Sequence, residues 1–222
     1  MEFLSIFDVI GPNMIGPSSS HTAGACSMGL LARKMCQVPI KSVVFTLYGS
    51  FAKTYEGHGT DRALLGGILG FATDDVRIRD SFDWAKKGGV AYEYVVDNGT
   101  TMPHPNTADM DIICEDDSKL FVRGVSIGGG RVKVTRINNI DVEFTGEYST
   151  LIVQQLDTPG VVAHITNCLS HHDVNIAFMR LFREKKGACA FTIVESDEKI
   201  PKAILDEIKT NKHVQTLMLV QI

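Results

Sequence analysis

The chain has 222 residues, a formal net charge of -4 and 44% hydrophobic residues, the ordinary balance of a globular protein of one or two domains. The negative charge gives no electrostatic reason to expect binding to nucleic acid or to an anionic membrane surface. No apolar run approaches the roughly 20 residues that a membrane-spanning helix needs. Met1–Ser5 opens with an acid and lacks the basic segment of a signal peptide, so we expect a cytoplasmic protein.

The cysteines argue against a metal centre held by this chain alone. There are five of them, widely scattered along the sequence. No two have the C-x-x-C spacing typical of zinc sites, and no run resembles an iron–sulfur ligand motif. We therefore expect no metal ligands in this chain.

The first notable element is residues 16–22, Gly-Pro-Ser-Ser-Ser-His-Thr, in which four hydroxyls surround one imidazole. A run with helical spacing follows, whose predicted buried face is Met28, Leu31, Ala32 and Met35. Ser and Thr cap helix starts, and a helix N-terminus attracts anions. Capping uses only one or two hydroxyls, so the whole cluster indicates a site for a carboxylate or a phosphate.

The rest of residues 1–147 predicts a single α+β domain. The expected strands are 42–48 and 91–96, the expected helix is 61–71, and an antiparallel set follows at 111–114, 120–127 and 131–137. Turns are expected at 115–118 and 128–130. The sequence has no phosphate-binding GxxxxGK[ST] loop and no GxSxG nucleophile motif.

Two more histidines of this domain lie in loops like the first. His58 stands in Gly-His-Gly-Thr-Asp and His104 in Pro-His-Pro-Asn-Thr, and each of the three histidines is followed within three residues by a threonine. A solvated turn residue is the ordinary interpretation of any one of them, but three such loops favour a shared site. Histidine exchanges protons near neutral pH, and hydroxyl and amide donors suit a small amino or hydroxy acid.

In residues 148–222 the pattern is different, because strand and helix signals alternate without long loops between them. The expected elements are strands 151–153, 174–182, 189–194 and 214–220, with helices from 161 and from 201. Their order is β-α-β-β-α-β, the ferredoxin-like topology. Together with the first domain it predicts an α+β protein of two domains, 1–147 and 148–222.

The second domain resembles an ACT domain. The resemblance rests on Asp157, Pro159, Gly160, Val161, Ala163, Ile165, Thr166, Leu169 and residues 174–176. ACT domains usually sense amino acids and associate in pairs. The resemblance implies an effector loop at Asp157, Pro159 and Gly160, and self-association through this domain, for which we expect the strands at 151 and 214 to offer exposed edges.

The loops of the first domain resemble, together, the beta subunit of bacterial iron–sulfur L-serine dehydratases. The matching segments are 16–24, 57–61, 104–107 and 126–130, and the resemblance spans essentially the full chain. It implies a lyase that converts L-serine to pyruvate and ammonia with a [4Fe-4S] cluster and without pyridoxal phosphate. Since this chain lacks cysteines for the cluster, the resemblance implies a separate alpha subunit that carries it, and a beta chain that is inactive alone.

The same resemblance implies roles for particular residues. The substrate carboxylate and amino group would be held by Ser18, Ser19, Ser20 and Thr22. The acid–base candidates are His21, His58 and His104, with Thr60 and Asn106 as orienting groups, and the sequence leaves open which histidine takes the α-proton. Asp61 is equally well explained as a first-turn carboxylate that favours its helix dipole.

A regulatory amino-acid-binding protein without catalytic residues is the alternative interpretation. The first domain is also similar to the substrate-binding domain that precedes an ACT domain in some phosphoglycerate dehydrogenases. An effector pocket needs donors for an anion but no proton-transfer groups, so the three histidine loops distinguish the two hypotheses.

Overall fold

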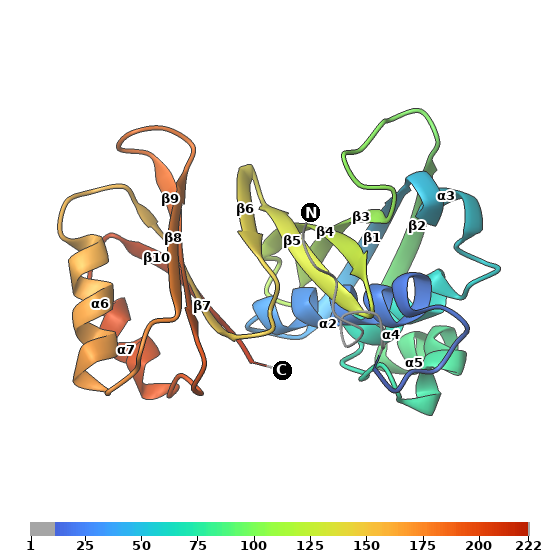
Figure 1. The fold of residues 1–222 in the computed structure, drawn as a ribbon, viewed down its shortest axis with the longest axis horizontal. Coiled ribbons are helices and arrows are strands. Elements are labelled where there is room, and N and C mark those ends of the chain that lie inside the picture. The colour runs from blue at the N-terminus through green and yellow to red at the C-terminus, as the bar shows by residue number, and fades with distance from the viewer. Residues whose placement is uncertain (1–11, 222) are drawn as a thin grey trace, which may run out of the picture. The chain divides into compact units, whose positions relative to one another are not determined.

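The computed structural model describes residues 12–221, and the chain divides into two compact units between Asn138 and Asn139. Met1–Ser5, on which the expectation about a signal peptide rests, lies outside the described residues. Within residues 12–221 no helix is both long and apolar enough to cross a membrane. Helices and strands occur in both units, so the α+β prediction is confirmed (Figure 1).

The sheet strands of the first unit lie in the order β2-β1-β3-β4-β5. The strands are β1 (Ile40–Tyr48), β2 (Ala91–Asp97), β3 (Thr107–Cys114), β4 (Lys119–Gly128) and β5 (Arg131–Ile137). β1 pairs in parallel with β2 and antiparallel with β3, and β3, β4 and β5 pair antiparallel in succession. The predicted antiparallel set is therefore confirmed.

The helical segments of the first unit are a π-helical turn η1 (Ser19–Ala23), α2 (Gly24–Met35), α3 (Gly49–Thr54), α4 (Thr60–Ile68), a 3-10 turn η2 (Val76–Asp80) and α5 (Ser81–Gly88). The predicted face of α2 is confirmed, since Met28, Leu31, Ala32 and Met35 are each at most 2% exposed. α4 ends at Ile68, before the predicted Phe71. Gly70 takes a left-handed φ of 87°, and the N–H of Phe71 turns back to the carbonyl of Gly66.

Helices α2 and α4 pack closely because each has a glycine where they meet. A Cβ at Gly29 would lie 2.3 Å from the carbonyl oxygen of Leu64, and a Cβ at Gly67 would lie 2.2 Å from that of Cys26. A side chain at either position would push the helices apart. This approach holds the beginning of α4 beside η1, where two of the histidine loops lie.

The second unit starts with β6 (Ile140–Phe144) and continues with the predicted β-α-β-β-α-β order. The elements are β7 (Ser149–Leu156), α6 (Val161–His171), β8 (Phe178–Arg183), β9 (Cys189–Ser196), α7 (Ala203–Lys209) and β10 (Val214–Val220). β8 begins at Phe178 and not at the predicted Val174. Asp173 takes a left-handed φ of 55°, and the N–H of Val174 bonds back to the carbonyl of Leu169 as α6 ends.

Strands β7 to β10 form a sheet of order β10-β7-β9-β8 in which neighbouring strands are antiparallel. Helices α6 and α7 lie together on one face of it (Figure 1). The core between them includes Leu151, Val153, Val161, Ile165, Leu169, Val194, Ile204, Ile208 and Leu217. The strand of Leu151 is interior, so the expectation that it offers a free edge is wrong. The edges are β10 and β8, and on β8 the side chains of Phe178 and Leu181 are 46% and 44% exposed.

Candidate active site

The residues singled out in the first domain all lie in the first unit, on three connections. Ser18 precedes η1, while Ser19, Ser20, His21 and Thr22 belong to it; His58 precedes α4 and Thr60 opens it; His104 and Asn106 lie between β2 and β3. Two of these connections meet directly through their histidines. The third joins them through a serine that the sequence did not single out.

His21 and His58 form the centre of the site. Their ring centroids are 4.9 Å apart with an angle of 42° between the ring planes. The ring of Phe51 packs edge-on against His21 at 5.2 Å. Burial lowers the pKa of His21 below its ordinary value of 6.5, and the charge of the neighbouring His58 lowers it further. The neutral imidazole of His21 is therefore favoured near neutral pH, and this form can accept a proton.

The η1 turn uses two of its predicted substrate-binding hydroxyls to build the site itself. The side chain of Ser18 accepts a hydrogen bond from the N–H of His21 at 3.1 Å. The hydroxyl of Thr22 donates to the carbonyl of His58 at 2.9 Å. Ser18 thus caps the turn, and Thr22 ties the first histidine loop to the second. Ser19 and Ser20, in the same turn, have partly exposed side chains.

Ser50, in α3, connects the first histidine loop with the third. Its Oγ lies 2.9 Å from Nε2 of His21. Its backbone N–H donates to the carbonyl of Pro105 at 2.7 Å, directly beside His104. The hydrogen bond of the His104 ring is local, because its Nδ1 accepts from the N–H of Asn106 at 3.1 Å. Burial lowers the pKa of His104 as well.

Three buried polar atoms around this centre have no hydrogen-bond partner among residues 12–221. They are Oγ1 of Thr60, Oγ of Ser126 and Nδ1 of His58, and the residues Thr60 and Ser126 are 0% exposed. Leaving such a group unpaired costs about 1–3 kcal/mol, so most buried polar groups in proteins have partners. Unpaired groups of this kind next to a histidine pair are those that a polar ligand or an ordered water would satisfy.

Ser126, at the end of β4, lies against the start of α2. A Cβ at Gly24 would fall 2.1 Å from the Ser126 Oγ, so glycine is needed for the two segments to approach. The N–H of Ser126 donates to the carbonyl of Asn106 at 3.0 Å. The β4 strand is thereby linked to the third histidine loop. Ser126 belongs to the segment 126–130 that carries the family resemblance, but the sequence predicted no role for it.

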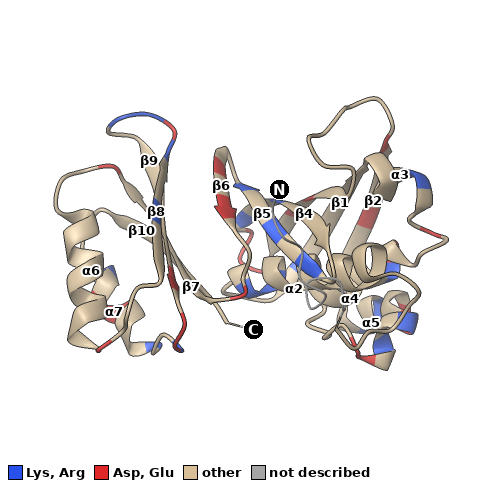
Figure 2. Cartoon of the chain, viewed as in Figure 1, with Lys and Arg blue, Asp and Glu red and all other residues tan. Residues whose placement is uncertain are grey.

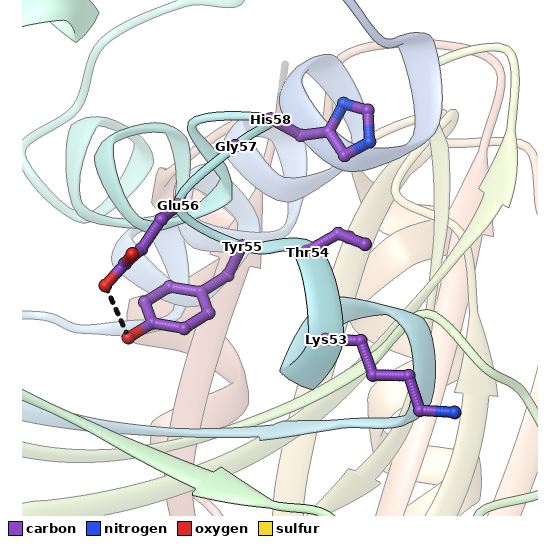
Figure 3. Close-up of a pocket in the computed structure, with 6 residues that line it drawn as sticks. All are labelled: Lys53, Thr54, Tyr55, Glu56, Gly57 and His58. Atoms are coloured by element: carbon purple, nitrogen blue, oxygen red, sulfur yellow. Dashed lines mark hydrogen bonds between the residues drawn. The ribbon is translucent and has the colours of Figure 1, made fainter.

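An open pocket of about 370 Å³ lies beside His58, lined by Lys53, Thr54, Tyr55, Glu56, Gly57 and His58 (Figure 3). Figure 3 shows the side chains of Lys53, Thr54 and His58 extending to the same side. Tyr55 and Glu56 point the other way and share a hydrogen bond of 3.0 Å. The pocket thus offers an ammonium and an imidazole together, a set suited to a small carboxylic acid, while the Thr54 hydroxyl already donates to the carbonyl of Ser50.

Asp61 is engaged in local structure. Its Oδ1 accepts the N–H of Arg62 at 2.7 Å, and its carbonyl accepts the hydroxyl of Tyr94 at 2.6 Å. Burial raises the pKa of its carboxyl. These contacts fit the interpretation of Asp61 as a residue of the first turn of its helix.

The described residues do not fit an iron–sulfur cluster. Between residues 12 and 221 no group of three or more His, Cys, Asp or Glu side chains is arranged as metal ligands. The cysteines are free thiols, and Cys26, Cys114 and Cys168 are buried. Burial raises the pKa of Cys26 and of Cys36 to about 12 each, which disfavours the thiolate that iron requires.

In the second unit the predicted effector loop has its charge already paired. Oδ2 of Asp157 accepts the N–H of Gly187 and a guanidinium N–H of Arg183, each at 3.0 Å. Both partners come from the basic β8–β9 hairpin (Figure 2). These two hydrogen bonds hold the pKa of Asp157 below its usual value. Pro159 and Gly160 are exposed, and Gly160 has a left-handed φ of 88° before α6.

The fold and the histidine loops define a two-part protein with a polar site in an α+β unit and an ACT domain. Comparison with known proteins agrees: the ACT domain family model matches residues 149–213, and the family model "Serine dehydratase beta chain" matches residues 5–93. The chain belongs to the family of L-serine dehydratase beta chains.

Two relatives match the chain over nearly its full length and support this family assignment. The "L-serine dehydratase, beta chain" of Peptoniphilus asaccharolyticus is 40% identical over 221 residues, covering 97% of this chain and all of the relative. The "Probable L-serine dehydratase, beta chain" of Bacillus subtilis (strain 168) is 39% identical over 208 residues, 94% of each chain. A more distant relative, the D-3-phosphoglycerate dehydrogenase of the same organism, is 23% identical over 203 residues, which cover 89% of this chain and 37% of that enzyme.

Proposed function

We propose that this chain supplies substrate-binding and proton-transfer groups to an L-serine dehydratase whose alpha subunit is a separate chain. The observation that carries the proposal is the His21–His58 pair, with its rings 4.9 Å apart, surrounded by unpaired buried atoms. Histidine side chains packed into an ordinary structural turn would have both nitrogens exposed or paired. The relatives named as beta chains supply the reaction: elimination of water from L-serine, which yields pyruvate and ammonia.

Each group of the site has a place in this reaction. One neutral imidazole takes the α-proton and becomes imidazolium, the bond between the β-carbon and the hydroxyl breaks, and the hydroxyl receives a proton from an imidazolium and leaves as water. The resulting enamine tautomerises to an imine, whose hydrolysis releases ammonia and pyruvate. Burial favours this role for His21, because a lowered pKa keeps the ring neutral at lower pH.

Substrate binding is proposed for the hydroxyls and for the pocket next to them. Ser19 and Ser20 have partly exposed side chains in η1, and the unpaired hydroxyl of Thr60 lies at the start of α4. Ser18 and Thr22 assist by holding the turn and the His58 loop. His104 and Asn106, on the third connection, are proposed as acid–base and orienting groups.

The [4Fe-4S] cluster is proposed for the alpha subunit, since the described residues of this chain do not fit it. When bound there, it supplies a Lewis acid for the substrate's oxygens. The reaction steps assigned to this chain are binding and proton transfer only. We propose further that the enzyme is cytoplasmic and that it is active as a complex of the alpha and beta chains.

A reconstitution experiment tests the proposal. This chain is co-expressed with the cysteine-bearing alpha chain, iron is reconstituted anaerobically, and pyruvate formation from L-serine is measured for each chain and for the complex. We expect activity in the complex only. Activity of the alpha chain alone, equal to that of the complex, would assign this chain to the alternative, an amino-acid-binding regulatory subunit.

A second candidate function, binding of a small amino acid by the ACT domain, is favoured by one observation. Oε1 of Gln155 and Oγ1 of Thr192 are buried in its sheet and have no hydrogen-bond partner within the described residues, and Gln155 lies two residues before Asp157. Isothermal calorimetry of the full chain with L-serine, compared with a Gln155→Leu variant, tests it. A smaller heat for the variant would support this function, no heat for either protein would contradict it, and equal heats would assign the binding to the first unit instead.

A further inference from the structure

Ser50 lies where the three histidine loops converge, although no sequence motif pointed to it. It follows Gly49 at the end of β1, and Gly49 has a left-handed φ of 56°. A Cβ at Gly49 would lie 2.5 Å from the carbonyl oxygen of Pro105. Glycine therefore permits both the turn and the close approach that bring Ser50 to the third loop.

Every hydrogen-bonding group of Ser50 is connected to one of the loops. Its Oγ binds Nε2 of His21 at 2.9 Å, and its N–H donates to Pro105 at 2.7 Å. Its carbonyl accepts the hydroxyl of Thr54 at 2.8 Å, and the carbonyl of Thr54 in turn accepts the N–H of His58 at 3.1 Å. One residue thus links the backbone of two loops to the ring of the third.

We propose that Ser50 is a positioning residue whose Oγ accepts the Nε2–H of His21 and so fixes the orientation and tautomer of that ring. The inference rests on the proposed function. The Ser50 hydroxyl occupies Nε2, and the His21 ring makes no other hydrogen bond with the described part of the chain. In this arrangement Nε2–H donates to Ser50 Oγ, so Nδ1 carries no proton and is the nitrogen that takes one from the substrate. Which nitrogen of a histidine is free for this exchange is set by the bond that the other one makes.

The replacement Ser50→Ala removes the hydroxyl and leaves the two backbone hydrogen bonds in place. In the full chain, labelled with nitrogen-15 at histidine, we expect His21 to change from one dominant tautomer to a mixture of two. In the assembled enzyme, kcat should fall about tenfold to a hundredfold, because a small misplacement of a reacting group has an effect of this size. KM should change far less than kcat, and the acid limb of the kcat profile should shift.

Two further variants separate positioning from folding. Ser50→Thr keeps the hydroxyl and should restore the tautomer and most of kcat. Ser27→Ala, on α2 and outside the site, is the matched control and should behave as wild type. Far-ultraviolet circular dichroism and Tm confirm that each variant is folded, and His21→Gln assigns the His21 resonance.

The outcomes distinguish this inference from the proposed function. If Ser50→Ala keeps a single His21 tautomer and an unchanged pH profile, Ser50 does not position the ring and the inference is wrong. If the tautomer changes while turnover of both Ser50→Ala and His21→Gln stays at the wild-type value, the positioning role holds and the catalytic role of His21 fails.

Discussion

The histidine loops of the first unit and the Asp157 loop of the second unit differ in whether their polar groups have hydrogen-bond partners. In the second unit, Asp157 is paired with Arg183 and Gly187. In the first, the hydroxyls of Thr60 and Ser126 and one nitrogen of His58 are buried without partners in the described part of the chain. Paired groups stabilise the fold, whereas unpaired buried groups cost stability and remain available for a ligand. The comparison therefore suggests that the polar groups of the first unit are kept for binding and chemistry, and that Asp157 maintains the shape of its loop.

The largest effects are expected from replacing the histidines. His21→Ala, His58→Ala and His104→Ala should each lower turnover of the assembled enzyme by about 10²–10⁴-fold, the usual contribution of a general acid or base. Size-exclusion chromatography with the alpha chain should show an unchanged complex. Wild-type turnover in all three variants would contradict the proposal that the polar groups of the first unit take part in catalysis.

A pair of threonine replacements tests whether the unpaired groups are costly to stability. Thr60→Val removes a hydroxyl without a partner, so the free energy of unfolding should rise by about 1 kcal/mol. Thr22→Val removes a hydroxyl that donates to His58, so that free energy should fall by about 1 kcal/mol. Urea unfolding measures both, and turnover of Thr60→Val should fall roughly tenfold, the equivalent of one hydrogen bond of about 1.4 kcal/mol.

The two replacements are controls for each other, because each exchanges a hydroxyl for a methyl on a buried threonine. Equal destabilisation by both would mean that the Thr60 hydroxyl is satisfied in solution. The contrast between unpaired groups in the histidine loops and paired groups in the Asp157 loop would then lose its energetic basis.

The pH dependence follows from the lowered pKa of His21, caused first by burial and then by His58. Between the folded pKa and the ordinary value of 6.5, the unfolded chain binds more protons than the folded one, so stability rises with pH through this window. The base must be neutral, so the acid limb of kcat/KM should lie below pH 6.5. His58→Gln should move the His21 pKa upward, as measured by NMR. An acid limb above pH 6.5 in the wild-type enzyme would contradict the assignment of His21 as the base.

The smallest effect is expected at Asp157. Its lowered pKa means that its carboxylate contributes stability above the pKa of an unfolded aspartate, and that this contribution disappears as the pH falls through the folded pKa. Asp157→Asn should therefore lower Tm slightly at pH 7 and not at acidic pH. Glu184→Gln in the same hairpin is the charge-matched control. A loss of Tm independent of pH would show that the charge is not what stabilises the loop.

Much of the fold could be predicted because periodicity records which side of each element is buried. The α2 face of Met28, Leu31 and Met35 and the topology of the ACT unit both followed from it. Strand order did not, because a sequence pattern does not say which strand lies at a sheet edge. The strand of Leu151 lies inside, between β10 and β9.

The sequence by itself determined the three polar loops, because runs of such polar residues do not pack into a hydrophobic core. Only the tertiary structure decided which atoms meet. The 2.9 Å contact of His21 with Ser50 joins residues 29 positions apart, and it depends on the turn at Gly49. The contact of Thr22 with His58 likewise requires α2 and α4 to approach at Gly29 and Gly67. Local patterns set burial residue by residue, whereas a hydrogen bond between distant segments is fixed by packing to a few tenths of an ångström.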